Sequence, residues 1–353
     1  MAVIKQDDLI QSVADALQFI SYYHPVDFIQ AMHEAYLREE SPAARDSMAQ
    51  ILINSRMCAT GHRPICQDTG IVTVFVRVGM DVRWDGATMS VDDMINEGVR
   101  RAYNLPENVL RASILADPAG ARKNTKDNTP AVIHYSIVPG DKVEVDVAAK
   151  GGGSENKSKM AMLNPSDSIV DWVLKTVPTM GAGWCPPGML GIGIGGTAEK
   201  AAVMAKEVLM DPIDIHELKA RGPQNRIEEL RLELFEKVNQ LGIGAQGLGG
   251  LTTVLDVKIM DYPTHAASLP VCMIPNCAAP TSCSTAPAPP NWKRRRSTPT
   301  RRSSGKPARP RAASTWTRSP RKRCKAGNRA RPCCSTARCS PAATPRTSAW
   351  STC

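Results

Sequence analysis

Three cysteines have neighbours that suit metal ligands better than core residues. Cys66 lies in GHRPICQDTG, Cys185 in GAGWCPPGMLGIGIGG and Cys277 in PVCMIPNCAA, and each segment contains Gly or Pro. Most unpaired cysteines are small buried hydrophobes, and Cys58, within a helical pattern, fits that description. Thiolates that hold an iron-sulfur cluster must reach one small inorganic group from several directions, which requires loops whose backbone can come close. The three segments are therefore candidate ligand loops.

Several polar residues are candidates for binding or proton transfer, although each also has an ordinary structural interpretation. Gln67 and Asp68 follow the first cysteine, where Asp before Thr-Gly usually forms a turn. Arg111 could bind a carboxylate or be a solvated helix residue, and His265 alone would more often be structural. The glycine triplet Gly151–Gly153 offers backbone N–H groups to an anion, but glycine triplets are usually flexible loops. The residue types alone leave both interpretations open.

The elements that must position these residues include both helices and strands. Apolar residues recur at steps of three and four from Ile4 to Met57, which predicts amphipathic helices. Further helical patterns cover 166–176, 198–209 and 227–241, and strand-like runs cover 71–78 and 252–260. The segment 131–148 contains a Pro-Gly-Asp turn between two β-rich runs and predicts a hairpin. We therefore expect an α+β fold, a mixed helix and sheet domain.

One glycine pattern resembles a nucleotide-binding motif. Gly191, Gly193 and Gly196 match GxGxxG, and a helical pattern follows them. A dinucleotide site would require a preceding strand in a βαβ unit and an acidic residue about 20 positions later. These glycines instead follow a Trp-Cys-Pro-Pro loop, so we expect them to permit close packing near the cysteines.

The distribution of charge divides the chain near residue 278. The net charge is +10, but 18 of the 44 Lys and Arg residues and none of the 34 acidic residues lie in 279–353. Residues 1–278 therefore carry −8 and form the expected catalytic domain. Residues 279–353 contain no Leu, Ile, Val, Met, Phe or Tyr, so we expect a disordered, Arg, Pro and Ser-rich tail. A basic arm that binds nucleic acid is one interpretation of that tail.

A reading-frame error is the interpretation of the tail that we favour. If one base was lost near Ala279, permitted codons for Pro280 to Arg301 restore the text THFVLDGSGPAELEAPSLDAYP, and later codons permit GKMLTGRDAAHKRM. These strings are domain-like, whereas the tail as written is not. We accordingly expect no nucleic-acid partner. The N-terminus has no apolar stretch of signal-peptide or membrane-span length, which predicts a cytoplasmic protein without a membrane association.

The cysteine segments, together with LRASILADPAGARKNTKDNTPAVIHY, AAKGGGSENKSKMAML and YPTHAASLPVCMIPNCAA, resemble class I fumarate hydratases over the whole body of the chain. The resemblance implies a 4Fe-4S cluster held by Cys66, Cys185 and Cys277, with one iron left without a protein ligand as a Lewis acid. Cys272 is the rival third ligand, but the match to NCAA favours Cys277. The restored text GKMLTGRDAAHKRM is similar to the smaller C-terminal domain of that family.

The resemblance also implies roles for the polar candidates. Asp68 would be the catalytic residue that accepts or relays the proton of the substrate hydroxyl, and Gln67, Arg111, Gly152 and His265 would contact the substrate. Three further residues would support the site or the fold: Lys126, Asp127 and Lys157. A homodimer is implied as well.

The implied reaction is the reversible hydration of fumarate to malate, and the alternative within the same chemistry is the α subunit of a tartrate dehydratase. A separate α subunit is expected to stop near the end of the cluster domain, whereas the restored text continues into a smaller domain. In the family that smaller domain supplies a proton-abstracting threonine and basic residues, which this chain as written lacks. The 353-residue product is therefore expected to be inactive.

Overall fold

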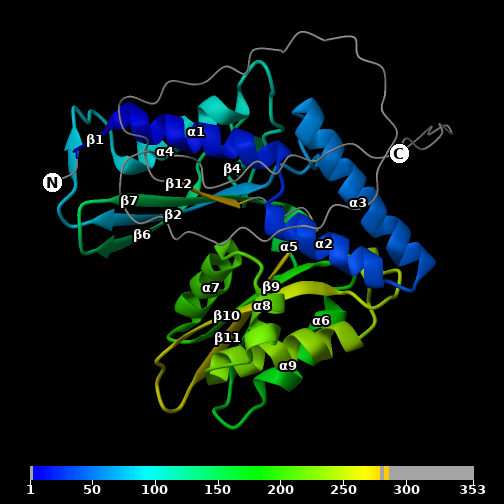
Figure 1. Cartoon of the computed structure of the whole chain (residues 1–353). Helices are drawn as coiled ribbons and strands as arrows, with labels where there is room; N and C mark the ends of the chain where they lie inside the picture. The colour runs from blue at the N-terminus through cyan, green and yellow to red at the C-terminus, as the bar shows by residue number, and fades with distance from the viewer. Residues whose placement is uncertain (1–2, 279–281, 286–353) are drawn as a thin grey trace, which may run out of the picture.

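Two four-stranded sheets organise the chain, one in each of two lobes that lie one above the other in Figure 1. The structure is a computed structural model, and it describes residues 3–278 and 282–285. The predicted mixture of helices and sheets is confirmed. The predicted disordered tail falls largely outside the described residues, but 282–285 form a short strand, which that prediction did not include.

The first lobe contains a sheet with the strand order β12-β7-β2-β6. Its strands are β2 (Ile71–Gly79), β6 (Val132–Val138), β7 (Val143–Lys150) and β12 (Ser282–Thr285). Two helices, α1 (Gln6–Tyr22) and α4 (Val91–Tyr103), pack together and bury their apolar sides against the sheet. Strand β2 takes a central position because its apolar run is buried almost throughout.

The predicted hairpin at 131–148 is wrong. Both of its strands form, but β2 lies between them, parallel to β6 and antiparallel to β7. The turn that joins them passes over the end of β2, where Gly79 N donates to Lys142 O at 2.8 Å and Met80 N donates to Val138 O at 2.9 Å. A turn motif alone could not reveal this arrangement, because the inserted strand comes from some 50 residues earlier in the sequence.

The second lobe contains a sheet with the order β10-β9-β11-β8. Its strands are β8 (Lys159–Leu163), β9 (Gly188–Gly195), β10 (Val254–Tyr262) and β11 (Leu269–Asn276). Four helices accompany it: α6 (Ile169–Thr179), α7 (Ala198–Glu207), α8 (Ile215–Arg221) and α9 (Arg226–Gln240). Strands β9 and β11 were not predicted, because Gly in one and Pro in the other are typical of loops.

The GxGxxG glycines lie on and just after strand β9, and they permit close packing as expected, but against helix α7 rather than against the cysteine loops. A Cβ at Gly191 would lie 2.1 Å from Ala205 O, and one at Gly193 would lie 2.0 Å from Ala201 O. Both oxygens belong to α7, so the helix backbone lies directly on the strand. Gly196 has a φ of +66° in the turn that leads into that helix. These glycines therefore have a packing role, with no need of a nucleotide.

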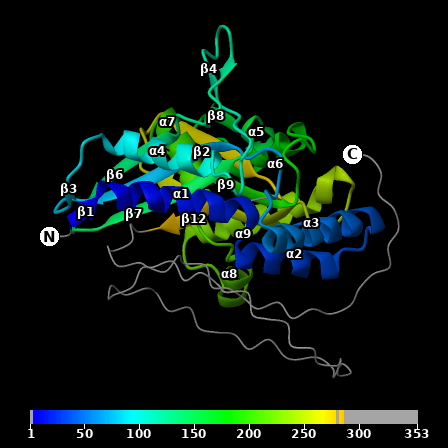
Figure 2. The same ribbon diagram turned by 90° about the horizontal axis from the view of Figure 1, so that it is seen from above.

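The predicted N-terminal helices form as α1, α2 (Val26–Arg38) and α3 (Pro42–Gly61), and Figure 2 shows α2 and α3 side by side. Ser41 caps α3, and Pro42 occupies its first turn, where a missing N–H costs no hydrogen bond. His62 ends α3 in a left-handed conformation, with a φ of 48°. The chain then turns toward Cys66.

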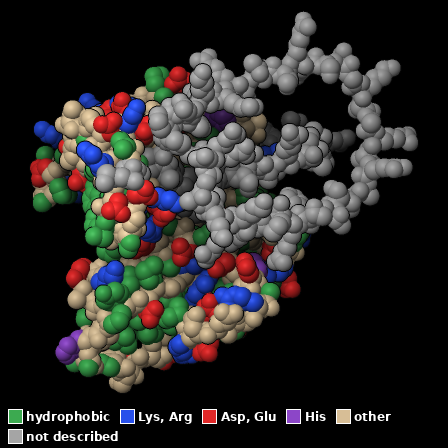
Figure 3. Space-filling view, turned by 60° about the vertical axis from the view of Figure 1, so that its left-hand side comes forward, with side chains coloured by type: hydrophobic (Ala, Val, Ile, Leu, Met, Phe, Trp, Pro, Cys, Tyr) green, Lys and Arg blue, Asp and Glu red, His purple; other side chains and the backbone are tan. Residues whose placement is uncertain are grey.

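The remaining elements are short. They are β1 (Val3–Lys5), β3 (Arg83–Asp85), β4 (Leu115–Ala116), β5 (Lys123–Asn124), α5 (Gly152–Glu155), and the 3-10 turns Val208–Met210 and Ala245–Gly247. Within the described part of the chain, no helix is both long and apolar enough to cross a membrane. On the face in Figure 3, acidic and basic side chains are interspersed rather than gathered into one basic surface.

We expect His24 to make folding sensitive to acid. Its ring is buried between α1 and α2 against Phe28, and neither ring nitrogen has a hydrogen-bond partner among the described residues. Burial lowers its pKa from 6.5 to about 4, so the folded protein disfavours the protonated ring. The unfolded chain takes up the proton first as the pH falls below 6.5, and stability decreases until the pH reaches about 4.

The His24→Phe variant removes this titration and retains an apolar ring. From pH 7 to pH 5, the free energy of unfolding of the unmodified protein should fall by about 2 kcal/mol more than that of the variant. Urea unfolding at the two pH values measures the difference. An identical fall in both proteins would show that His24 does not cause it.

Candidate metal centre

Cys66 lies in the loop between α3 and β2, and the following residues hold its sulfur in place. The backbone N–H of Asp68 donates to Cys66 Sγ at 3.4 Å, and Gln67 Oε1 lies 3.6 Å from the same sulfur. Cys66 is half-buried and Gln67 is exposed. The loop therefore presents a thiol that solvent can reach, with an amide beside it.

The Asp68 carboxylate connects this loop to the glycine turn. Its Oδ2 accepts from Gly152 N at 2.7 Å, and its Oδ1 accepts from Gly70 N at 3.1 Å. Two backbone donors fix the orientation of the carboxylate. The turn itself comes close, since a Cβ at Gly151 would lie 3.0 Å from Asp68 Oδ2. The sequence-predicted residues Asp68 and Gly152 are therefore in direct contact.

Cys185 lies in the loop between α6 and β9, close to both of the other cysteines. The pKa of its thiol is raised by partial burial and by the neighbouring Cys66 thiol. Its carbonyl accepts from Ala278 N, the residue after Cys277, at 3.0 Å. Its φ is +57°, a left-handed value that is unusual for a residue other than Gly. The Cys185 loop thus lies beside both the Cys66 thiol and the backbone that follows Cys277, so three segments far apart in the sequence meet in one region.

Cys277 directly follows β11, whereas its rival Cys272 lies inside that strand. Cys272 pairs with Gly193 of β9, is 3% exposed, and belongs to an apolar core cluster. Burial raises the pKa of its thiol to about 11, which disfavours the thiolate that metals require. Cys58 is buried in α3, as expected for a small hydrophobe. The geometry therefore favours Cys277 as the third candidate ligand.

The donor set fits an iron-sulfur cluster better than a single metal ion. Within the described ranges, no three His, Cys, Asp or Glu side chains are close enough to share one ion. A cluster has a different requirement, because each thiolate binds a separate iron at its own corner. Three thiols, none of them in a disulfide, on loops with close backbone approaches, fit that requirement. Cys66, Cys185 and Cys277 could therefore hold such a group.

Arg111 is brought to the same region through its backbone. The Thr69 hydroxyl donates to Arg111 O, and the buried Tyr103 hydroxyl donates to Thr69 O at 2.7 Å. The pKa of Tyr103 is raised by burial and by the nearby Asp68 charge, so its hydroxyl remains a donor. The Arg111 side chain is exposed, and its guanidinium has no partner among the residues described. It is available to bind an anion.

His265 is not brought to the cysteines. It lies in the connection between β10 and β11, beside the end of β9, whereas Cys185 and Cys277 flank the opposite end of that sheet. Six to seven strand residues separate the two ends, which corresponds to about 20 Å. Its Nδ1 accepts from Ala267 N at 3.1 Å within its own turn. Within one chain, His265 cannot contact a ligand bound at Cys185.

Two of the remaining predicted residues have structural contacts. Asp127 accepts from Arg100 Nε at 3.0 Å and from Thr129 N at 3.0 Å, so it stabilises the fold. Lys157 packs close to Gly183 in the Cys185 loop, with 2.8 Å between its Cε and a Cβ built there. Lys126 has a φ of 70° and lies exposed in a turn. None of these contacts assigns a catalytic role.

Sequence reasoning missed a buried lysine and two partly buried ions beside the glycine turn. Lys150 Nζ lies 3.2 Å from Glu155 Oε2, and Lys206 Nζ lies 2.5 Å from Glu155 Oε1. Burial lowers the pKa of Lys150 to about 8, while the charge of Glu155 opposes that shift. The position of Lys150 next to a glycine triplet was the available signal, but its burial depends on packing between the two lobes.

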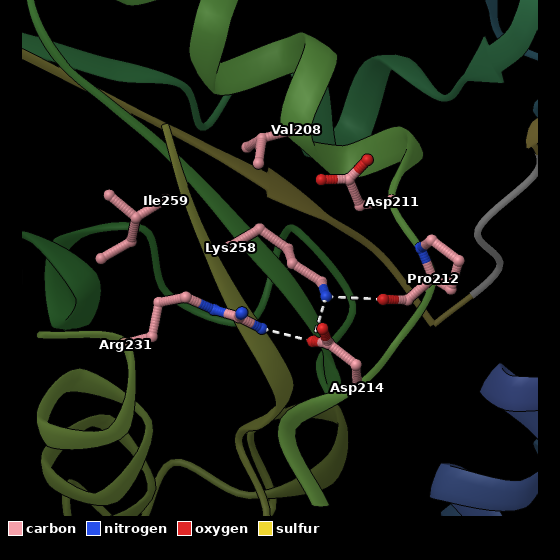
Figure 4. Close-up of a pocket in the computed structure, with 7 residues that line it drawn as sticks. All are labelled: Val208, Asp211, Pro212, Asp214, Arg231, Lys258 and Ile259. Carbon is pink, nitrogen blue, oxygen red and sulfur yellow. Dashed lines mark hydrogen bonds and ion pairs between the residues drawn. The ribbon is translucent and has the colours of Figure 1, made fainter. Parts of the chain in front are cut away.

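A polar cavity of about 170 Å³ lies apart from the predicted site residues. Its polar lining includes Asp211, Asp214, Arg231 and Lys258, as Figure 4 shows. Lys258 and Arg231 both bind Asp214, at 2.5 Å each. Burial alone would raise the pKa of Asp214, but these two hydrogen bonds lower it to about 2. Because its buried cations are paired with carboxylates, we interpret this group as a stabilising network.

Comparison with known proteins identifies the family to which this arrangement belongs. The sequence model described as fumarate hydratase (Fumerase) matches residues 10–284. The chain belongs to the fumarate hydratase (Fumerase) family. A relative in Methanocaldococcus jannaschii, named "Putative L(+)-tartrate dehydratase subunit alpha", is 36% identical over 273 residues, which are 76% of this chain and 93% of the relative.

Two similar relatives come from Escherichia coli. Both are named L(+)-tartrate dehydratase subunit alpha, at 30% identity over 275 residues in strain UTI89 and 29% over 274 residues in strain K12. Each alignment covers 77% of this chain and 88% of the relative. Fumarate hydratase family membership makes the chain a member of a hydro-lyase family, and all three candidate cysteines lie inside the matched range.

Proposed function

We propose that this chain is the cluster-carrying part of a hydro-lyase that interconverts fumarate and malate. The observation that carries the proposal is the approach of three loop cysteines to one another beside the contact between Asp68 and Gly152. Cys66, Cys185 and Cys277 are proposed to hold a 4Fe-4S cluster. When bound, such a cluster supplies a Lewis acid to a substrate oxygen through an iron without a protein ligand.

The neighbouring residues are proposed to bind the substrate and move a proton. The Asp68 carboxylate, oriented by two backbone N–H groups, would accept the proton of the substrate hydroxyl. The exposed Arg111 guanidinium would bind a substrate carboxylate in a bidentate manner. Gln67 and the Gly152 turn would complete the substrate contacts. We also propose a homodimer, in which any contact from His265 would have to come from the other copy.

The tartrate dehydratase α subunit is the second candidate, and the names of the relatives favour it. On that reading the natural partner would be a separate β subunit rather than a C-terminal domain of the same chain. We still propose that residues 279–353 are a frame-shifted remnant of the smaller domain, and that the chain as written is inactive. Resequencing the gene around the codon for Ala279 tests the frame directly.

An anaerobic substrate panel distinguishes the two candidates. The 353-residue chain and the product of the frame-corrected gene would each be supplied with iron and sulfide and assayed with fumarate, malate, mesaconate and L(+)-tartrate. We expect fumarate hydration by the corrected product and none by the chain as written. Preferential dehydration of tartrate would select the second candidate. A product without iron or activity toward any of the four acids would contradict the proposal.

A further inference from the structure

A buried ammonium lies behind the glycine turn, in a position to which no role has been assigned. The Lys150 side chain is 7% exposed at the end of β7 and lies between the two lobes. Glu155, at the end of the turn, and Lys206, from α7, complete a group of three charges. This group has one positive charge in excess. A buried excess charge is costly unless an opposite charge is close.

Lys150 holds the turn through two of its residues. Its Nζ donates to Ser154 Oγ at 3.0 Å, and Ser154 Oγ in turn donates to Gly151 O at 3.2 Å. Its contact with the Glu155 carboxylate holds the other end of the turn at 3.2 Å. Helix α5, Gly152–Glu155, is a single turn that begins with glycine, so it has little intrinsic stability. The Lys150 ammonium therefore restrains the Gly151–Glu155 turn.

The same turn and the same ammonium both reach the candidate metal centre. Gly152 N in the turn donates to Asp68 Oδ2 at 2.7 Å, and Asp68 N donates to Cys66 Sγ at 3.4 Å. On its other side, Lys150 lines the same small cavity as Asn276, the residue before Cys277, and is close enough to Cys277 for their charges to interact. The excess positive charge thus lies where negatively charged thiolate ligands would gather.

We propose that Lys150 is a positioning residue with two separable effects. Through Ser154 and Glu155 it holds the Gly151–Glu155 turn against Asp68. Through its charge it stabilises the negative ligand set around Cys277, an effect that rests on the proposed function. The first effect belongs to the folded chain alone, whereas the second requires a bound cluster.

The hold on the turn is tested in the full chain without added iron. Hydrogen exchange, followed by mass spectrometry, should be accelerated by about tenfold or more at the turn amides in Lys150→Met and in Ser154→Ala, as expected for the loss of one charge-assisted hydrogen bond. The matched control is Lys206→Met, which removes a cation from the same group but has no contact with Ser154. Because Lys206 also binds Glu155, exchange at those amides should be accelerated in this variant, but less than in Lys150→Met, which loses the contacts with both Ser154 and Glu155.

The effect of charge is tested in the full chain after anaerobic supply of iron and sulfide. Lys150→Met should shift the reduction potential of the cluster to more negative values, because a nearby positive charge stabilises the reduced form. Ser154→Ala retains the ammonium and should leave the potential unchanged. Lys206→Met should shift the potential less than Lys150→Met. An electron paramagnetic resonance redox titration measures all three variants.

The outcomes separate this inference from the proposed function. If the unmodified chain takes up no iron, the proposed function and the effect of charge both fail, while hydrogen exchange still tests the hold on the turn. Turn amides that exchange in Ser154→Ala as slowly as in the unmodified chain would overturn that hold, even if Lys150→Met does not fold. A potential that is equal in Lys150→Met and Lys206→Met would overturn the effect of charge.

Discussion

Replacing any one of Cys66, Cys185 and Cys277 with Ser is expected to abolish retention of the cluster. Each residue would supply the sole protein ligand to a different iron, so the remaining two cannot compensate. Turnover of the frame-corrected enzyme should fall by more than the roughly 10 to 100-fold that follows removal of a residue supporting a metal ligand. Iron and sulfide analysis, together with visible absorbance of anaerobic samples, measures retention directly.

Two other cysteines serve as matched controls for these substitutions. Cys272→Ala and Cys58→Ala remove thiols that are buried in a core strand and a helix, so iron content should be unchanged. Both variants can lose some stability because each leaves a small cavity. Retention of iron in Cys277→Ser, together with loss of iron in Cys272→Ala, would show that Cys272 rather than Cys277 is the third ligand. Loss of iron in none of the five variants would remove the basis for the site.

The sequence predicted most of the longer helices because their apolar residues repeat locally, but it did not predict α4 or α8. Helices α1, α2 and α3 were expected between Ile4 and Met57, and α6, α7 and α9 also appear where the pattern placed them. The hairpin prediction failed because strand neighbours are determined by sheet packing, and β2 lies between the two predicted strands, parallel to β6 and antiparallel to β7. Strands β9 and β11 were missed because their Gly and Pro residues serve close packing that only the tertiary structure shows.

Some features of the candidate site could likewise be predicted from local sequence, whereas others depend on tertiary structure. The three cysteine loops, Asp68 and Gly152 could be selected from local sequence, since their neighbours permit close backbone approach. The burial of Lys150 could not be predicted from local sequence, because it depends on Lys206 from α7 and on the packing of the two lobes. The separation of His265 from the cysteines is equally a result of strand order. Residue types therefore indicated candidates, whereas topology decided which of them share a site.

Asp256→Asn is expected to lower the free energy of unfolding by about 3 to 5 kcal/mol, the cost of leaving buried charges unpaired. The Asp256 side chain is fully buried, 3.2 Å from Arg231 Nη2 and 3.1 Å from Lys258 Nζ. It also accepts from Asp214 N at 3.0 Å. After the substitution, Asp214 is the carboxylate that remains to pair with both cations. Urea unfolding of the full chain measures the loss.

A surface ion pair and a double variant show whether charge is the cause. Glu229→Gln breaks the exposed pair with Arg226, so it should change stability by less than about 1 kcal/mol. Adding Lys258→Met to Asp256→Asn removes one unpaired cation, and the double variant should therefore be more stable than the sum of the two single losses predicts. If the two losses simply add, the cost comes from packing around Asp256. If the double variant is more stable than that sum, the cost comes from the buried charge that Asp256 neutralises.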